Sequence, residues 1–224
     1  MTQSGHRAEA PLLDYGQLLA LRAEHGEPTD EEVENYLRLP GEMLQSGWDA
    51  EVVRVRNWLS RGGGDDPLLK QADTLVHVAE INANSAFTPL LKKFSFLREV
   101  DAKHWDFILT IAGVFVAVDQ LVNMGLSENR QRKLMGKVGA KLIQRHPSNG
   151  RHGFEDCAAF YERSLNAFAS EGDDPRFVAS DPLGFWVVWN VLGRPPESEE
   201  ERRLVRTIGG MIHYTFLNWW KGST

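Results

Sequence analysis

Apolar side chains recur along most of this chain three and four residues apart, which is the spacing of one face of an α-helix. Trp48, Val52, Val55 and Leu59 show this spacing within the segment 42–60. The alternation of apolar and polar residues that marks a half-buried strand is scarce by comparison. The sequence therefore predicts an all-α protein, built as a helical bundle or an orthogonal helical array of about nine helices.

Two capping boxes mark the starts of predicted helices. Thr29 with Glu32, and Ser198 with Glu201, have the three-residue spacing at which each side chain bonds the backbone N–H of the other residue. We therefore expect a short helix after Thr29. We also expect a last helix that starts at Ser198 and reaches about residue 220.

The middle of the chain contains the most apolar predicted helix. This helix covers residues 103–124, and we expect it to lie at the centre of the fold. Another helix is predicted to start at Pro67 and run to about residue 86, because proline is well tolerated in the first turn of a helix. Pro89 is expected to end or kink that helix, since proline lacks the N–H that continues the hydrogen-bond ladder.

Residues 61–66 contain three consecutive glycines and form the clearest break in the helical pattern. Glycine loses more backbone entropy in a helix than any other residue, so a helix through this segment is unfavourable. We predict four regions: a flexible tail at 1–11, an acidic helical annex at 12–60, a Gly-rich linker at 61–66 and a main helical domain at 67–221.

Composition narrows the class of protein. The chain has 25 basic and 31 acidic residues and a net charge of −6, which argues against a general nucleic-acid coat protein. Its single cysteine, Cys157, excludes a disulfide framework within the chain and a zinc site made of several cysteines. The polar N-terminal residues lack the apolar core of a secretory signal, and the uncharged stretches are too short for a membrane span. These features predict a cytoplasmic protein.

Charge is unevenly distributed along the chain. The segment 127–152 holds seven Lys and Arg residues, and Glu128 is its only acid. Four of these cations recur every four residues on the helix predicted at 127–146, and we call them the basic stripe: Lys133, Lys137, Lys141 and Arg145. The apolar residues of this helix are predicted to face the core: Leu134, Met135, Val138, Leu142 and Ile143.

The segment 24–51 has the opposite charge, with nine acids against Arg38 alone. This contrast predicts a non-catalytic interaction or adaptor protein, in which the basic helix and the acidic N-terminal segment pair with each other, within one chain or between subunits, or contact a protein partner. The predicted partner-binding residues are Arg130, Lys133, Lys137, Lys141 and Arg145. Nucleic-acid binding through the basic helix is a third hypothesis, and the negative net charge argues against it.

A metal-dependent helical enzyme is the alternative hypothesis. Asp73, His77 and Glu80 are spaced to share one helix face, and Asp101 precedes His104 by three residues. Imidazole and carboxylate groups in such rows bind transition metals. The predicted ligands are Asp73, His77, Glu80 and His104. However, the seven histidines have six acidic neighbours at these spacings, against about four expected from composition, so the row by itself is a weak signal.

Three further polar residues lie in or at the end of apolar helices and are candidates for a pocket: Asp119, Asn123 and His213. A buried carboxylate or imidazole there would need a hydrogen-bond partner. Nucleophilic catalysis has no support, since the chain has neither a Gly-x-Ser-x-Gly elbow nor a P-loop. Cys157 follows Asp156 inside a predicted helix, and a nearby acid raises the pKa of a thiol, so we expect an inert core residue.

Overall fold

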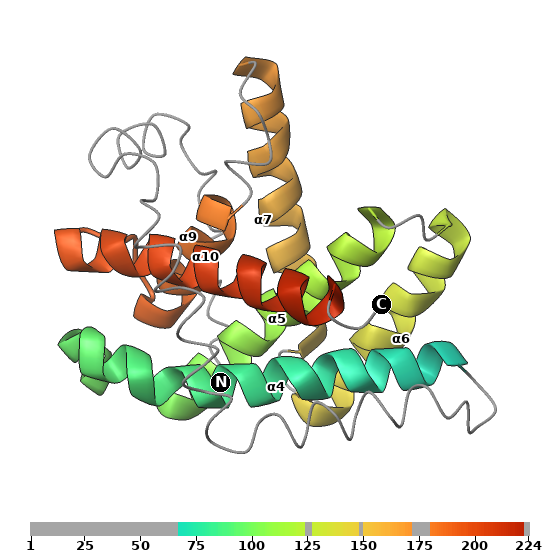
Figure 1. Cartoon of the computed structure of the whole chain (residues 1–224), viewed down its shortest axis with the longest axis horizontal. Helices are drawn as coiled ribbons and strands as arrows, with labels where there is room; N and C mark the ends of the chain where they lie inside the picture. Colours follow the sequence, from blue (N-terminus) through green and yellow to red (C-terminus); the bar gives the residue numbers. More distant parts are fainter. Residues whose placement is uncertain (1–66, 124–126, 148–149, 172–179, 222–224) are drawn as a thin grey trace, which may run out of the picture.

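The computed structural model describes residues 67–123, 127–147, 150–171 and 180–221. This part of the chain is all-α and contains no strand (Figure 1). Its elements, in chain order, are α4 (Pro67–Lys93), the short 3-10 helix η2 (Ser95–Glu99), α5 (Ala102–Asn123), α6 (Glu128–Arg145), α7 (Gly150–Glu171), α9 (Ser180–Leu192) and α10 (Glu199–Lys221). Six α-helices are therefore seen here, and the predicted count of about nine is not confirmed. The helices predicted at 12–60 lie outside the described residues.

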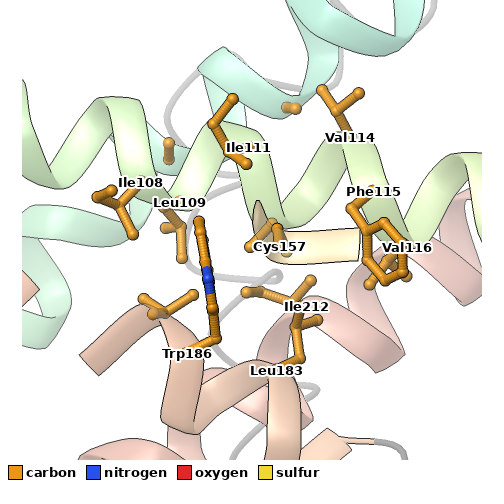
Figure 2. Close-up of a cluster of buried hydrophobic side chains, with 14 of the residues drawn as sticks. Ile108, Leu109, Ile111, Val114, Phe115, Val116, Cys157, Leu183, Trp186 and Ile212 are labelled. Atoms are coloured by element: carbon orange, nitrogen blue, oxygen red, sulfur yellow. The ribbon is translucent and has the colours of Figure 1, made fainter. Parts of the chain in front are cut away.

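The helix α5 lies at the centre of the described fold, as its apolar sequence predicted. Every residue of 107–118 is buried, and α5 packs against α4, α6, α7, α9 and α10. Figure 2 shows its side chains meeting Cys157 of α7, Trp186 of α9 and Ile212 of α10. Burial on all sides explains why this helix has no polar face, because no part of its middle contacts water.

Two tryptophans in this core satisfy their polar atoms with partners from other helices. The indole Nε1 of Trp105 donates a hydrogen bond to the carbonyl oxygen of Ala83 at 3.2 Å. The indole Nε1 of Trp186 donates to Oδ2 of Asp156 at 2.9 Å. A buried indole N–H without a partner costs free energy, so these bonds fix which way each ring faces. They tie α5 to α4, and α9 to α7.

Pro89 neither ends α4 nor separates it from the following residues, which corrects the predicted boundary near residue 86. The helix continues to Lys93 with Pro89 inside it. The missing N–H of Pro89 leaves one bond of the ladder unmade. Ala86 and Leu90 on either side are fully buried, so apolar packing offsets this local loss. After Lys93 the chain forms only the short helix η2 before α5 begins.

The capping box at the start of α10 is confirmed. The backbone N–H of Glu201 donates to Oγ of Ser198 at 3.1 Å, and the backbone N–H of Ser198 donates to Oε2 of Glu201 at 3.0 Å. Arg194 adds two charged hydrogen bonds, at 2.6 Å to Oε1 and 3.1 Å to Oε2 of the same carboxylate. Glu201 thus holds the turn before α10 against the first turn of the helix.

This carboxylate makes part of the stability pH-dependent. Hydrogen bonds from Arg194, and then from the backbone N–H groups of Ser198 and Glu197, lower the pKa of Glu201 from 4.5 to about 2. A lowered folded-state pKa contributes stability above the unfolded-state value, and that stability is lost as the pH falls from about 4.5 to about 2. We expect Glu201→Gln, which keeps the box but removes the charge, to lower the free energy of unfolding by about 1–2 kcal/mol at pH 7.

Urea unfolding at pH 7 and at pH 2 measures this effect. The difference between the wild type and Glu201→Gln should become much smaller at pH 2, where the Glu201 carboxyl of the folded protein is about half protonated. The control is Glu200→Gln, an exposed neighbour in the same turn, which should change little at either pH. A difference that is the same at both pH values would contradict the assigned role of the charge.

The helices α9 and α10 approach each other closely at Gly184. A Cβ atom at this position would overlap the carbonyl oxygen of Val205 and lie 2.9 Å from the backbone nitrogen of Gly209. Both obstacles are backbone atoms, so they cannot move as a side chain would.

None of the described helices is both long enough and apolar enough to cross a membrane.

Candidate functional site

The basic helix predicted at 127–146 is α6, and its buried side is largely as expected. Leu134, Val138 and Leu142 are fully buried, and Met135 is partly buried against the same core. Ile143 is a correction, because 40% of it is exposed. A helical residue points about 100° away from its neighbour, so Ile143 lies beyond the face that Leu142 directs into the core.

Carboxylates of α4 pair with the cations in the C-terminal half of α6. The Nζ atom of Lys141 lies 3.1 Å from Oδ1 of Asp73, and Nη2 of Arg145 lies 3.7 Å from the same oxygen. Arg145 also donates through Nη1 to Oε2 of Glu80. We call these four residues the ion-pair cluster. Figure 1 shows α6 passing across α4, and the ion pairs of the cluster join these two helices.

The ion-pair cluster is only partly accessible to water. Its side chains are between 19% and 37% exposed, so solvent screens these pairs less than it screens pairs on an open surface. Asp73 and Glu80 are seven residues apart and therefore share one face of α4. Two turns of one helix thus present carboxylates to two successive cations of the other.

His146 lies beside this cluster, although no pattern in the sequence marks it as a functional residue. Its ring packs edge-on against Phe107, with 5.0 Å between the ring centroids. Burial, and then the charge of Arg145, lower the pKa of His146. Its Nε2 atom is 3.8 Å from Oε1 of Glu80, but a neutral imidazole makes no ion pair with that carboxylate. Only the packing of α5 against the end of α6 creates this environment.

The N-terminal half of α6 has a different environment. Arg130, Arg132 and Lys133 are all exposed, and we call these three residues the basic patch. Within the described part of the chain, none of the three makes an ion pair. Lys137, the next cation of the basic stripe, is half-buried and has an interaction of its own. The basic stripe is therefore divided, because Lys141 and Arg145 join α6 to α4 whereas Lys133 faces solvent.

The structure does not bring the four predicted metal ligands together. Asp73 and Glu80 direct their oxygens to the cations of α6, and His77 is half-buried with an interaction of its own. His104 lies on α5, and its Nε2 atom is 2.8 Å from the carbonyl oxygen of Asn190 on α9.

A carbonyl oxygen can only accept a hydrogen bond. Nε2 of His104 therefore carries the ring proton and donates a hydrogen bond to the Asn190 carbonyl on α9. Across the residues described, no group of three or more His, Cys, Asp or Glu side chains could hold a metal ion. The transition-metal hypothesis is therefore supported only by the spacing of these residues in the sequence.

Of the three residues predicted to form a pocket, the structure describes the side chain of Asp119 only. Burial raises the pKa of the Asp119 carboxyl, and burial followed by the charge of Asp119 raises the pKa of the Tyr161 phenol. Asn123 lies in α5 and His213 in α10, but their side chains are outside what the structure describes, so the pocket stays a prediction.

Cys157 is fully buried, and burial followed by Asp156 raises the pKa of its thiol. The thiol is therefore protonated at neutral pH, as the sequence predicted.

Comparisons of the chain with protein-family models, curated proteins and solved structures find no match.

Proposed function

We propose that this protein is a non-catalytic interaction protein, and that it binds a carboxylate-rich protein surface through the basic patch on α6. The observation that carries the proposal is the contrast within one helix. Lys141 and Arg145 are matched by carboxylates of α4, while Arg130, Arg132 and Lys133 are exposed and make no ion pair with the described residues. Exposed cations on a folded helix are available to an acidic partner without rearrangement of the core.

The ion-pair cluster shows which chemistry this helix accepts. Arg145 contacts carboxylates of two α4 residues, and Lys141 contacts one. A guanidinium presents its donors as a fixed fork that fits the two oxygens of a carboxylate, and Arg130 and Arg132 offer the same fork to an incoming partner. The exposed cations would thus recognise the same chemical group that Lys141 and Arg145 already bind.

Net charge favours a protein partner over a nucleic acid. The whole chain carries a charge of −6, so at long range it repels any acidic partner, and it repels a polyphosphate backbone more strongly than a protein surface because the charge density of the backbone is higher. A local patch of three cations can attract an acidic protein surface within about 8–10 Å, beyond which physiological salt largely screens exposed charges. Contacts of this kind are sensitive to salt and mainly increase the rate of association.

The test measures the binding of a short fluorescent poly-glutamate peptide by fluorescence anisotropy at low salt. We expect the triple variant Arg130→Glu, Arg132→Glu, Lys133→Glu to bind the peptide at least about tenfold more weakly, since each exposed pair contributes up to about 1 kcal/mol. The matched control reverses three exposed cations away from α6, namely Lys92, Arg98 and Lys103. The control has the same net charge as the test variant and should bind almost as the wild type does.

Two results would overturn the proposal. One is equal loss of peptide binding in the test and control variants, which would show that only net charge matters. The other is tighter binding of an RNA or DNA oligonucleotide than of the peptide at the same residues, with the steep salt dependence of phosphate contacts. That second result would establish the nucleic-acid hypothesis instead.

A further inference from the structure

We propose that the acidic segment 24–51 of the same chain occupies the basic patch, and that an acidic partner must displace it. The regulatory part of this inference rests on the proposed function. The intramolecular contact does not, because it requires only that the two parts of the chain bind each other. The inference therefore assigns an occupant to the three cations of α6 that make no ion pair with the described residues.

Charge complementarity is the first argument. The segment 24–51 has nine acids and one basic residue, and so carries a charge of −8. The basic patch contributes three exposed positive charges within a single turn of α6. Carboxylates crowded at three- and four-residue spacings destabilise a helix by about 0.2–0.5 kcal/mol per pair, and a cationic surface removes that repulsion. Asp30, Glu31 and Glu34 show this crowding in the helix predicted after Thr29.

The length of chain between the two parts is the second argument. Residues 52–66 separate the acidic segment from Pro67, where α4 begins, and α4 packs directly against α6. Fully extended, this connection would span about 50 Å, and with 52–60 helical it would span about 34 Å. The helix α6 is about 27 Å long. The acidic segment can therefore reach the basic patch from its fixed end at α4.

The ion-pair cluster provides a precedent for the geometry. There, one helix places Asp73 and Glu80 against two cations of α6 that are four residues apart. Arg130 and Lys133 are three residues apart on α6, which suits carboxylates at helical spacing in the same way. The proposed contact would extend to the N-terminal half of α6 the charge pairing that α4 makes with its C-terminal half.

A second copy of the chain is the competing source of the same acidic segment. A short connection within one chain gives an effective concentration in the millimolar range. At micromolar protein concentration the contact should therefore form within one chain, and it should not depend on concentration.

Carbodiimide cross-linking of the full chain at micromolar concentration tests the contact directly. The reagent joins a lysine amine to a carboxylate that it touches, and mass spectrometry of the monomer band identifies the joined residues. We expect Lys133 to be joined to a carboxylate within 24–51, and the product to diminish at high salt. Reversing both sides, with Arg130→Glu, Arg132→Glu, Lys133→Glu and Asp30→Lys, Glu31→Lys, Glu34→Lys together, should restore a cross-link that either set alone abolishes.

Peptide binding tests the regulatory part. The variant Asp30→Asn, Glu31→Gln, Glu34→Gln should bind poly-glutamate more tightly than the wild type, by about tenfold if the patch is free one tenth of the time. The matched control neutralises three exposed acids elsewhere, Glu99, Glu162 and Glu200, and should leave the affinity almost unchanged.

The outcomes separate the two proposals. Absence of the cross-link from the monomer, or its appearance only in dimers at rising concentration, overturns the intramolecular contact. An unchanged peptide affinity on neutralising the acidic segment overturns displacement. If the cross-link forms but no variant binds the peptide through the basic patch, the proposed function fails while the intramolecular contact stands.

Discussion

Replacing Gly184 with alanine is expected to destabilise the protein by about 3 kcal/mol or more, the largest effect of any single substitution considered for this fold. The new methyl group would overlap the backbone carbonyl of Val205 on α10 and would lie 2.9 Å from the backbone nitrogen of Gly209. Neither atom can move without shifting its helix. The helices α9 and α10 would have to separate, which opens the packing around buried residues such as Trp186.

Chemical denaturation of Gly184→Ala against the wild type measures this effect. The control is Gly136→Ala on α6, where a Cβ atom would meet nothing within 4 Å. Because alanine has the higher helix propensity, that variant should gain about 0.5–1 kcal/mol of stability. A Gly184→Ala variant as stable as the wild type would show that α9 and α10 are not held as closely as described.

Reversing the charge of Arg145 is expected to have the second largest effect, a loss of about 2–4 kcal/mol. Arg145→Glu would place a third carboxylate beside Asp73 and Glu80, and would remove their shared cation. The side chains of Arg145 and Glu80 are only 29% and 19% exposed, so water compensates the repulsion poorly. The expected loss therefore exceeds that of an open surface pair.

The matched control is Arg130→Glu, which reverses an exposed cation on the same helix. It should change stability by no more than about 0.5 kcal/mol. Urea unfolding of both variants at low and high salt provides the measurement, and salt should recover part of the loss in Arg145→Glu. Equal and small effects at the two positions would contradict the division of α6 into a half that joins helices and a half that faces solvent.

This division matters for any experiment on binding. Reversing the basic stripe as a whole would include Lys141, whose amine is 3.1 Å from Asp73, and would disturb α4 together with any binding surface. The basic patch avoids this problem because its three side chains are exposed. Loss of binding on reversing the patch can therefore be separated from loss of folding.

Features that depend on a few neighbouring residues were predictable from the sequence. The box of Ser198 and Glu201 forms as its three-residue spacing indicates, and Leu134, Val138 and Leu142 are buried as their four-residue period indicates. The central position of α5 follows from a run of apolar residues too long to leave any face in water. These properties need only the geometry of one helix and the free energy of removing apolar groups from water.

Features that depend on contacts between distant segments were not predictable. The spacing of Asp73 and Glu80 on α4 is compatible with a metal site and also with partners on another helix, and only packing decides between these uses. Arg145 and Glu80 are 65 residues apart in the chain, and no local pattern relates them. The continuation of α4 past Pro89 also depends on contacts between distant segments, since burial against other helices outweighs the local tendency of proline to end a helix.

Local sequence patterns were enough to predict that this part of the chain is helical, where its last helix starts, which helix is central and where positive charge accumulates. Packing between helices is what pairs Lys141 and Arg145 with α4, leaves Ile143 exposed and requires that Gly184 has no side chain. The physical reason is range. Helix periodicity and capping involve atoms a few residues apart, whereas charge pairing and close helix contact depend on how whole helices pack in three dimensions.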